Sequence, residues 1–170
     1  MTYAPHHATL ATPIGRVTIT GDERVLTGVR IGSMVDAGLS GGEEPDHAPI
    51  GSPVAQAMQQ MTEYFAGVRQ RFDLPLAPLI SARGEALRAA IASIPYGETL
   101  SYGALAKAHD SGARAVGGAC RRNPYPIIIP CHRVTSSNGA AENYSGGDGP
   151  TTKAWLNAHE QTHRDIQTSN

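Results

Sequence analysis

The sequence predicts a mixed α/β fold of the α+β kind, in which a sheet-plus-helix lobe precedes a helical lobe. Polar and apolar residues alternate through the first third of the chain, which is rich in Thr, Val and Ile. Apolar residues then recur at helical spacing, and Pro75 and Pro78 interrupt the pattern as a linker would. A length of 170 residues fits one domain, or two small lobes that share a core.

The predicted boundaries follow from this pattern. We expect an N-terminal lobe at residues 1–77, a linker at 78–83, a C-terminal lobe at 84–160 and a loose tail at 161–170.

The first lobe should contain a three-stranded, mostly antiparallel sheet and one helix. Residues 8–22 and 24–32 alternate in strand fashion, and Gly15 and the pair Gly21-Asp22 mark the hairpin turns. Residues 32–52 are rich in Gly, Ser, Pro and Asp and predict a loop.

A helix is predicted at residues 52–67. Ser52 is a candidate N-cap, Pro53 suits the first turn and Gly67 ends the helix. Val54, Met58, Met61 and Phe65 fall at helical spacing and should face the core. Residues 71–76 predict one more short strand.

The second lobe should begin with a helix at residues 84–97, with Leu87, Ile91 and Ile94 on one face. Residues 99–124 then predict two short helices with a turn at 110–112, which is the pattern of a helix-turn-helix.

The second helix of this pair is rich in small residues. Such a face allows either a close approach to the narrow minor groove of DNA or tight packing inside the protein, and spacing alone favours packing. The small residues are Gly112, Ala113, Ala115, Gly117, Gly118 and Ala119.

The charge distribution and the cysteine content limit the possible partners and the cellular compartment. The net charge of −1 gives no overall attraction to nucleic acid, but residues 111–133 hold four arginines and no acid. That patch could meet phosphates, or it could be an ordinary solvated face. Two cysteines are too few for a disulfide framework, and the first residues lack the pattern of a signal peptide. We therefore expect a cytoplasmic protein with free thiols.

Cys131 follows an apolar run at residues 127–129, which predicts a rigid buried strand that ends at the cysteine, and it precedes His132. A thiol becomes a strong nucleophile when a base draws its proton, and the base needs an orienting carboxylate, for which Glu160 is a candidate. Adjacent side chains of an extended chain point apart, so contact between thiol and imidazole needs a turn at Pro130 or a bridging water. The alternative is a buried structural cysteine.

Four motifs together carry a family resemblance. PCHRV, with IPYGETLSYGALA, ARAVGGACRRNP and NYSGG, resembles the O6-alkylguanine-DNA alkyltransferases, which are also called methylated-DNA–protein-cysteine methyltransferases. The resemblance implies a ribonuclease-H-like N-terminal lobe and a C-terminal lobe with the helix-turn-helix and a cysteine loop. It implies direct reversal of damage: O6-alkylguanine, and also O4-alkylthymine, would lose its alkyl group to the protein, which is spent after one turnover.

The resemblance also implies residue roles at the reaction centre. Cys131 would be the alkyl acceptor and His132 the base that acts through a water, with Glu160 orienting the imidazole. Asn123 would brace the cysteine turn, and Tyr102 would donate a proton toward guanine N3.

On the DNA side, the resemblance implies that Arg114 enters the duplex and fills the gap left by the flipped nucleotide. The partner would be double-stranded DNA that contains O6-alkylguanine, bound by a monomer or by several copies along one DNA, and no cofactor, metal or membrane is expected. The implied DNA contacts are Arg114, Ala113, Ala115, Gly117 and Arg121, and the implied pocket residues are Pro126, Val134, Ser137, Glu142, Tyr144 and Ser145.

Departures from the family pattern carry their own expectations. The helix near residues 84–94 lacks the family's Phe and Trp and has Arg83 and Arg88 nearby, so the packing between the lobes should differ. Glu142 stands where most members have a small residue, so benzyl-sized groups should react more slowly than methyl.

Two other functions compete with alkyl transfer. A non-catalytic sensor of alkylguanine would not need Cys131, so the presence of this cysteine argues against that function. A Cys-His hydrolase or thiol oxidoreductase would leave the DNA-facing elements unexplained, and no CxxC motif is present.

Overall fold

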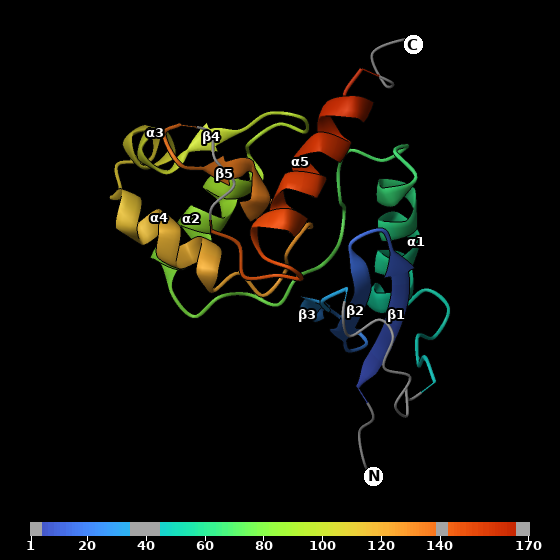
Figure 1. The fold of residues 1–170 in the computed structure, drawn as a ribbon. Coiled ribbons are helices and arrows are strands. Elements are labelled where there is room, and N and C mark those ends of the chain that lie inside the picture. The colour runs from blue at the N-terminus through green and yellow to red at the C-terminus, as the bar shows by residue number, and fades with distance from the viewer. Residues whose placement is uncertain (1–4, 35–44, 139–142, 166–170) are drawn as a thin grey trace.

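A computed structural model of the protein describes residues 5–34, 45–138 and 143–165. Its N-terminal lobe is the expected antiparallel sheet, in the order β1 (His6–Thr12), β2 (Gly15–Gly21) and β3 (Leu26–Ile31). Every second residue of β2 is buried, because that face of the sheet packs on the core beneath α1 (Figure 1). Gly15 makes the first hairpin turn with φ +110°, where a Cβ would stand 2.6 Å from the carbonyl oxygen of Gly32.

Helix α1 (Pro53–Phe65) begins and ends at the predicted residues. The Ser52 hydroxyl caps it by accepting a hydrogen bond from Ala55 N at 3.2 Å, and Gly67 follows it with φ +79°. Its buried face includes Val54 and Met61 as expected, whereas Met58 and Phe65 are only partly buried.

The strand predicted at residues 71–76 does not form. Leu26 pairs in a single parallel bridge with Leu76, through hydrogen bonds from Leu26 N to Pro75 O and from Ala77 N to Leu26 O. Pro75 has no amide hydrogen to extend this pairing into a ladder. This irregular segment therefore joins β3 through a single bridge at Leu26.

The C-terminal lobe consists of short helices with one small parallel sheet. Helix α2 (Ala82–Ala92) starts two residues earlier than predicted, because Ser81 caps it. Strand β4 (Leu100–Ser101) pairs with β5 (Val134–Thr135), and α3 (Tyr102–Ala108) and α4 (Ala113–Arg121) form the predicted helix-turn-helix. The chain closes with α5 (Pro150–His163).

The apolar run before Cys131 is not a strand, so this prediction is wrong. Ile127 has a φ of +76°, and the segment from Pro126 to Ile129 turns on itself with a single bridge between those two residues. Pro126 and Pro130 both lack an amide hydrogen, which prevents a regular ladder. Cys131 instead opens a short 3-10 turn, η2 (Cys131–Arg133).

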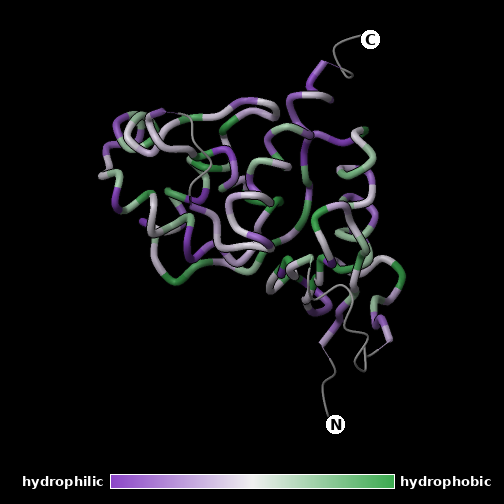
Figure 2. Tube along the Cα trace, viewed as in Figure 1, coloured by the Kyte–Doolittle hydropathy of each residue, from purple (hydrophilic) through white to green (hydrophobic). Residues whose placement is uncertain are grey.

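Helix α5 lies between the helical lobe and α1 (Figure 1). It extends to His163, so three residues of the predicted tail are helical, and Gln161 donates a hydrogen bond to Gly97 O at 3.0 Å. Among the described residues no helix has the length and apolar character needed to cross a membrane, and Figure 2 shows hydrophobic and hydrophilic residues interspersed along the trace.

Arg88 occupies the junction of the two lobes. Its guanidinium lies over the Tyr125 ring at 5.1 Å, and its Nη1 donates to Ala77 O at 3.2 Å. The Tyr125 hydroxyl in turn donates to Leu26 O of β3 at 2.8 Å. Two hydrogen bonds therefore join the lobes in this region, and the cation–π contact holds together the two side chains that donate them.

Candidate active site and DNA-facing helix

Cys131 is 4% exposed and is held by a neighbouring amide. The side-chain nitrogen of Asn123 donates to the Cys131 sulfur at 3.2 Å and to Ile129 O at 2.9 Å. The other end of the amide is fixed too, because Asn123 Oδ1 accepts from Tyr125 N at 3.0 Å. Burial raises the pKa of the Cys131 thiol, whereas the hydrogen bond from Asn123 and the charge of Lys153 lower it. Asn123 thus favours the thiolate at this position.

His132 is fully buried, and its Nε2 lies 2.7 Å from Oε1 of Glu160. Burial lowers the pKa of the imidazole, so the ring is neutral at physiological pH. A neutral ring beside an ionised carboxylate donates its Nε2 hydrogen and keeps the free lone pair on Nδ1. Nδ1 has no hydrogen-bond partner among the described residues, which leaves it available to accept a proton.

Glu160 is the centre of a buried hydrogen-bond network. Burial opposes its ionisation, but the contacts of His132 and Arg133 hold the pKa of this carboxyl well below its usual range. Arg133 donates to it through Nε at 2.8 Å and Nη2 at 3.0 Å, and the Tyr64 hydroxyl donates to it at 2.8 Å. The carboxylate is therefore ionised and fixed in place.

Tyr102 is the first residue of α3, and its hydroxyl accepts a hydrogen bond from Lys153 Nζ at 3.5 Å. Burial raises the pKa of Tyr102, and the negative charges of Cys120 and Cys131 raise it further. The phenol therefore keeps its proton at neutral pH and is available as a hydrogen-bond donor.

Lys153 was not predicted as a site residue. It is 1% exposed, and its Nζ also donates to Asn143 O at 3.1 Å. Lys153 and Glu160 are two helical turns apart on α5, so this spacing alone places both on the same face of the helix. That signal could have identified Lys153, whereas nothing in the sequence pattern points to the Tyr64 contact, which joins residues 96 positions apart.

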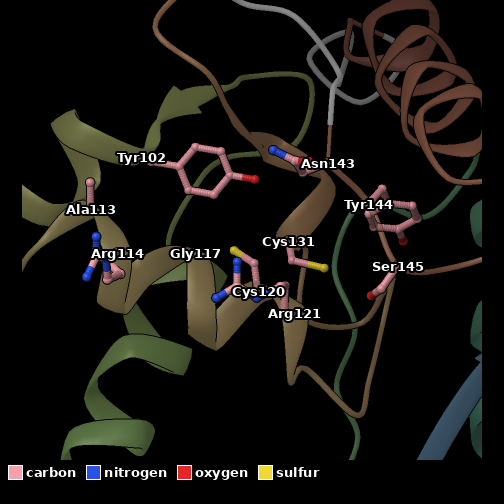
Figure 3. A pocket seen from close by; sticks show the side chains of 10 residues that line it. All are labelled: Tyr102, Ala113, Arg114, Gly117, Cys120, Arg121, Cys131, Asn143, Tyr144 and Ser145. Atoms are coloured by element: carbon pink, nitrogen blue, oxygen red, sulfur yellow. The ribbon is translucent and has the colours of Figure 1, made fainter.

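Two of these side chains, Cys131 and Tyr102, line a cavity of about 580 Å³ (Figure 3). Cys131 and Tyr102 lie on its wall together with predicted residues of α4 and of the loop before α5. Cys120 and Asn143 also line the cavity and were not predicted. The full lining is Tyr102, Ala113, Arg114, Gly117, Cys120, Arg121, Cys131, Asn143, Tyr144 and Ser145.

Helix α4 presents an exposed face at the mouth of this cavity. Ala113, Arg114 and Arg121 are exposed. A Cβ added at Gly117 would meet no heavy atom of the described residues within 4 Å, whereas one at Gly118 would lie 3.0 Å from the Arg122 guanidinium. Gly118 is buried, whereas the Gly117 position is open, so the outer face of α4 can approach another molecule closely at Gly117.

Of the predicted DNA contacts and pocket residues, five lie away from the cavity wall or outside the described residues. Ala115 lines a second groove, on the α2 side of α4. Val134 is fully buried in β5, and Pro126 pairs with Ile129. Ser137 is exposed at the end of a described segment, and Glu142 lies outside the described residues.

Comparison with known families agrees with this arrangement. Residues 6–78 match the ribonuclease-like domain of the 6-O-methylguanine DNA methyltransferases, and residues 84–162 match their DNA-binding domain. The chain belongs to the 6-O-methylguanine DNA methyltransferase family. The match to the DNA-binding domain includes Cys131, His132 and Glu160 as well as the helix-turn-helix.

Relatives from distant organisms cover most of the chain. The methylated-DNA–protein-cysteine methyltransferase of Rattus norvegicus is 37% identical over 91% of this chain and 81% of its own length. That of Methanosarcina acetivorans is 37% identical over 84% of this chain and 90% of its own length.

Solved structures of the methyltransferase family share the fold. The O6-methylguanine methyltransferase of Mycobacterium tuberculosis superposes with a TM-score of 0.75 at 33% identity, covering 98% of this chain and 100% of the other. The same protein in complex with DNA gives a TM-score of 0.76 at 36% identity, covering 93% and 94%. The two-lobed α+β architecture expected from the sequence is therefore the methyltransferase fold.

Proposed function

We propose that this methyltransferase repairs DNA by moving the alkyl group of O6-alkylguanine, and of O4-alkylthymine, onto Cys131 in a single turnover. The observation that carries the proposal is the setting of Cys131. Its thiol lines a cavity large enough for a flipped base, accepts a hydrogen bond from Asn123, and precedes a neutral histidine backed by an ionised carboxylate.

The proposed chemistry begins with proton removal. A water between the thiol and Nδ1 of His132 passes the Cys131 proton to the imidazole, and Glu160 stabilises the imidazolium that forms. The thiolate attacks the alkyl carbon, the bond between that carbon and O6 breaks, and its electron pair stays on the guanine. Tyr102 donates its proton toward guanine N3, which neutralises the leaving base.

The exposed face of α4 supports entry through the minor groove. Its open Gly117 position allows the helix to lie close to the groove, and Arg114 fills the stack vacated by the flipped nucleotide. Flipping costs a few kcal/mol and is easiest for a damaged, poorly paired base. Recognition would therefore depend on damage rather than on sequence, because the minor groove carries little base information.

The remaining assignments belong to the same proposal. The sheet-bearing lobe would span residues 1–77 and the DNA-binding and transfer lobe residues 84–160. The protein would act as a monomer, singly or in several copies along one DNA, in the cytoplasm and in contact with the nucleoid if the cell is prokaryotic.

Incubation with a duplex that contains O6-methylguanine, followed by intact mass measurement, tests the proposal. One added methylene per protein, with no second turnover at excess DNA, is the expected result. Bound but unmodified protein would instead indicate a sensor, and repeated turnover would indicate a hydrolase.

A further inference from the structure

A second thiol faces the cavity that holds Cys131. Cys120, on α4, is 9% exposed and lines the same 580 Å³ space. Figure 3 shows both sulfur atoms in the region between the Tyr102 ring and Ser145. Both cysteines are free. The single-step transfer to Cys131 does not use Cys120.

We propose that Cys120 captures a two-carbon alkyl group that carries a leaving group at its far end, after Cys131 has taken up that group. The product is one protein in which an ethylene bridge joins the two sulfur atoms. The substrates are 2-haloethyl groups, on guanine O6 or in a free dihaloethane. This inference rests on the role proposed for Cys131 as first acceptor.

Each step balances without an oxidant or cofactor. The Cys131 thiolate forms a bond to one carbon and releases guanine or a first halide, which gives an S-haloethyl cysteine. The same sulfur then displaces the second halide with its lone pair and closes a three-membered sulfonium ring. The Cys120 sulfur attacks one ring carbon, and the bond between that carbon and the Cys131 sulfur breaks and returns its electron pair to Cys131. The other ring carbon stays bonded to Cys131, and the Cys120 proton passes to water.

The surroundings of Cys120 support this order of events. Burial and the negative charge of Cys131 raise the pKa of Cys120 to about 12, so Cys120 is a poor first nucleophile. A thioether or sulfonium at Cys131 carries no negative charge, so that contribution is lost after the first transfer. The charge of Lys153, which lowers the pKa of Cys120, is still present.

The capture would matter for repair. A sulfonium at Cys131 is a strong electrophile that lines a cavity into which the damaged base is flipped. A thiol on the same wall offers it a partner other than the nucleic acid. The protein would then end the repair of a haloethyl lesion without a covalent link to DNA.

Treatment of the whole protein with 1,2-dibromoethane, followed by tryptic mapping, tests the inference. Arg121 and Arg122 separate the two cysteines, so residues 115–121 carry Cys120 and residues 123–133 carry Cys131. We expect these peptides to be joined by an ethylene bridge that resists reduction, and both free thiols to be lost. Two peptides that remain unlinked would overturn the inference, whether Cys131 is unmodified or carries a hydroxyethyl group. A bridge from Cys131 to any residue other than Cys120 would also overturn it.

Three matched controls separate this inference from the proposed function. Cys120→Ala should abolish the bridge and leave a hydroxyethyl group on Cys131, while it still takes up a methyl group from an O6-methylguanine duplex. Bromoethane, which has one leaving group, should give a single thioether at Cys131. Wild-type protein that accepts the methyl group yet forms no bridge would reject the capture step alone, whereas protein that accepts no methyl group would reject the proposed function.

Discussion

Cys131 and Cys120 are two buried thiols on the wall of one cavity, and their surroundings differ. Cys131 accepts a hydrogen bond from Asn123 and precedes a neutral base, His132. For Cys120 no such hydrogen bond is found in the described structure, and burial raises its pKa to about 12. Both cysteines line the same cavity, so we expect the hydrogen bonds and charges around each sulfur to decide which one reacts first.

The positions of the two cysteines in the fold explain this difference. Cys120 lies in the last turns of a regular helix, where the backbone amides and carbonyls are already paired. Cys131 lies in an irregular turn between Pro130 and β5, and the Asn123 side chain pairs with groups that no ladder satisfies. The irregular backbone around Cys131 creates the room for an activating network that a helix does not offer.

The largest expected effect comes from exchanging each thiol for a hydroxyl. Cys131→Ser should reduce methyl transfer from an O6-methylguanine duplex to background while the protein still binds the duplex, because a serine hydroxyl is far less ionised. Cys120→Ser should still transfer the methyl group. If the Cys120 variant loses methyl transfer but keeps the wild-type melting curve, Cys120 is also needed for the transfer, and the two sulfurs do not differ in the way expected.

Arg114→Ala tests whether Arg114 helps to flip the damaged base into the cavity that both sulfurs line. Transfer from duplex DNA should fall roughly a hundredfold, since the role proposed for Arg114 is to offset an unstacking cost of a few kcal/mol. Reaction with the free base O6-methylguanine should be unchanged, because no flipping is needed there. Arg114→Lys keeps the charge and serves as the control, and normal duplex repair by both variants would remove the role proposed for Arg114.

Asn123→Ala removes the hydrogen bond that distinguishes Cys131 from Cys120. A hydrogen bond to a charged group contributes about 1.5–3 kcal/mol, so the transfer rate should fall about tenfold to a hundredfold. The pKa of Cys131, measured from the pH dependence of iodoacetamide labelling, should rise. Asn123→Asp keeps the shape but loses the donor and adds a negative charge, and it should be slower still. An unchanged labelling profile in both variants would contradict this account.

The smallest expected effect is on the pH dependence of stability, which tests the buried hydrogen-bond network of His132 and Glu160. In the folded protein the pKa of His132 lies below its ordinary 6.5 and that of Glu160 below 4.5, so the folded state binds fewer protons than the unfolded chain. Their stabilisation is complete above pH 6.5 and is lost progressively as pH falls below 6.5 and then below 4.5. The melting temperature should decrease in that order. Glu160→Gln should remove the lower part of the dependence, and the exposed Glu98→Gln should not.

Local signals in the sequence predicted most of the elements. Ser52 and Gly67 bound α1, and the two short helices with a glycine-containing turn form the helix-turn-helix, because caps and turns depend on residues close in sequence. The run at residues 127–129 misled the prediction, since its β-branched side chains suit a strand while flanking prolines prevent one.

Part of the candidate site could be predicted because several of its residues are close in sequence. Cys131, His132 and Asn123 lie within ten residues, and the resemblance to a family connected them with Tyr102 and Glu160. Contacts made only by the tertiary fold were missed, such as the Tyr64 hydroxyl on Glu160 and the Lys153 amine near Tyr102.

The location of a transferred methyl group tests the contrast between the two thiols most directly. After reaction with an O6-methylguanine duplex, we expect one methylene on the tryptic peptide of residues 123–133 and an unmodified peptide of residues 115–121. Fragmentation should place the methylene on the Cys131 sulfur. A methyl group on Cys120, or one divided between the two peptides, would contradict the conclusion that the surroundings of Cys131 select it as the acceptor.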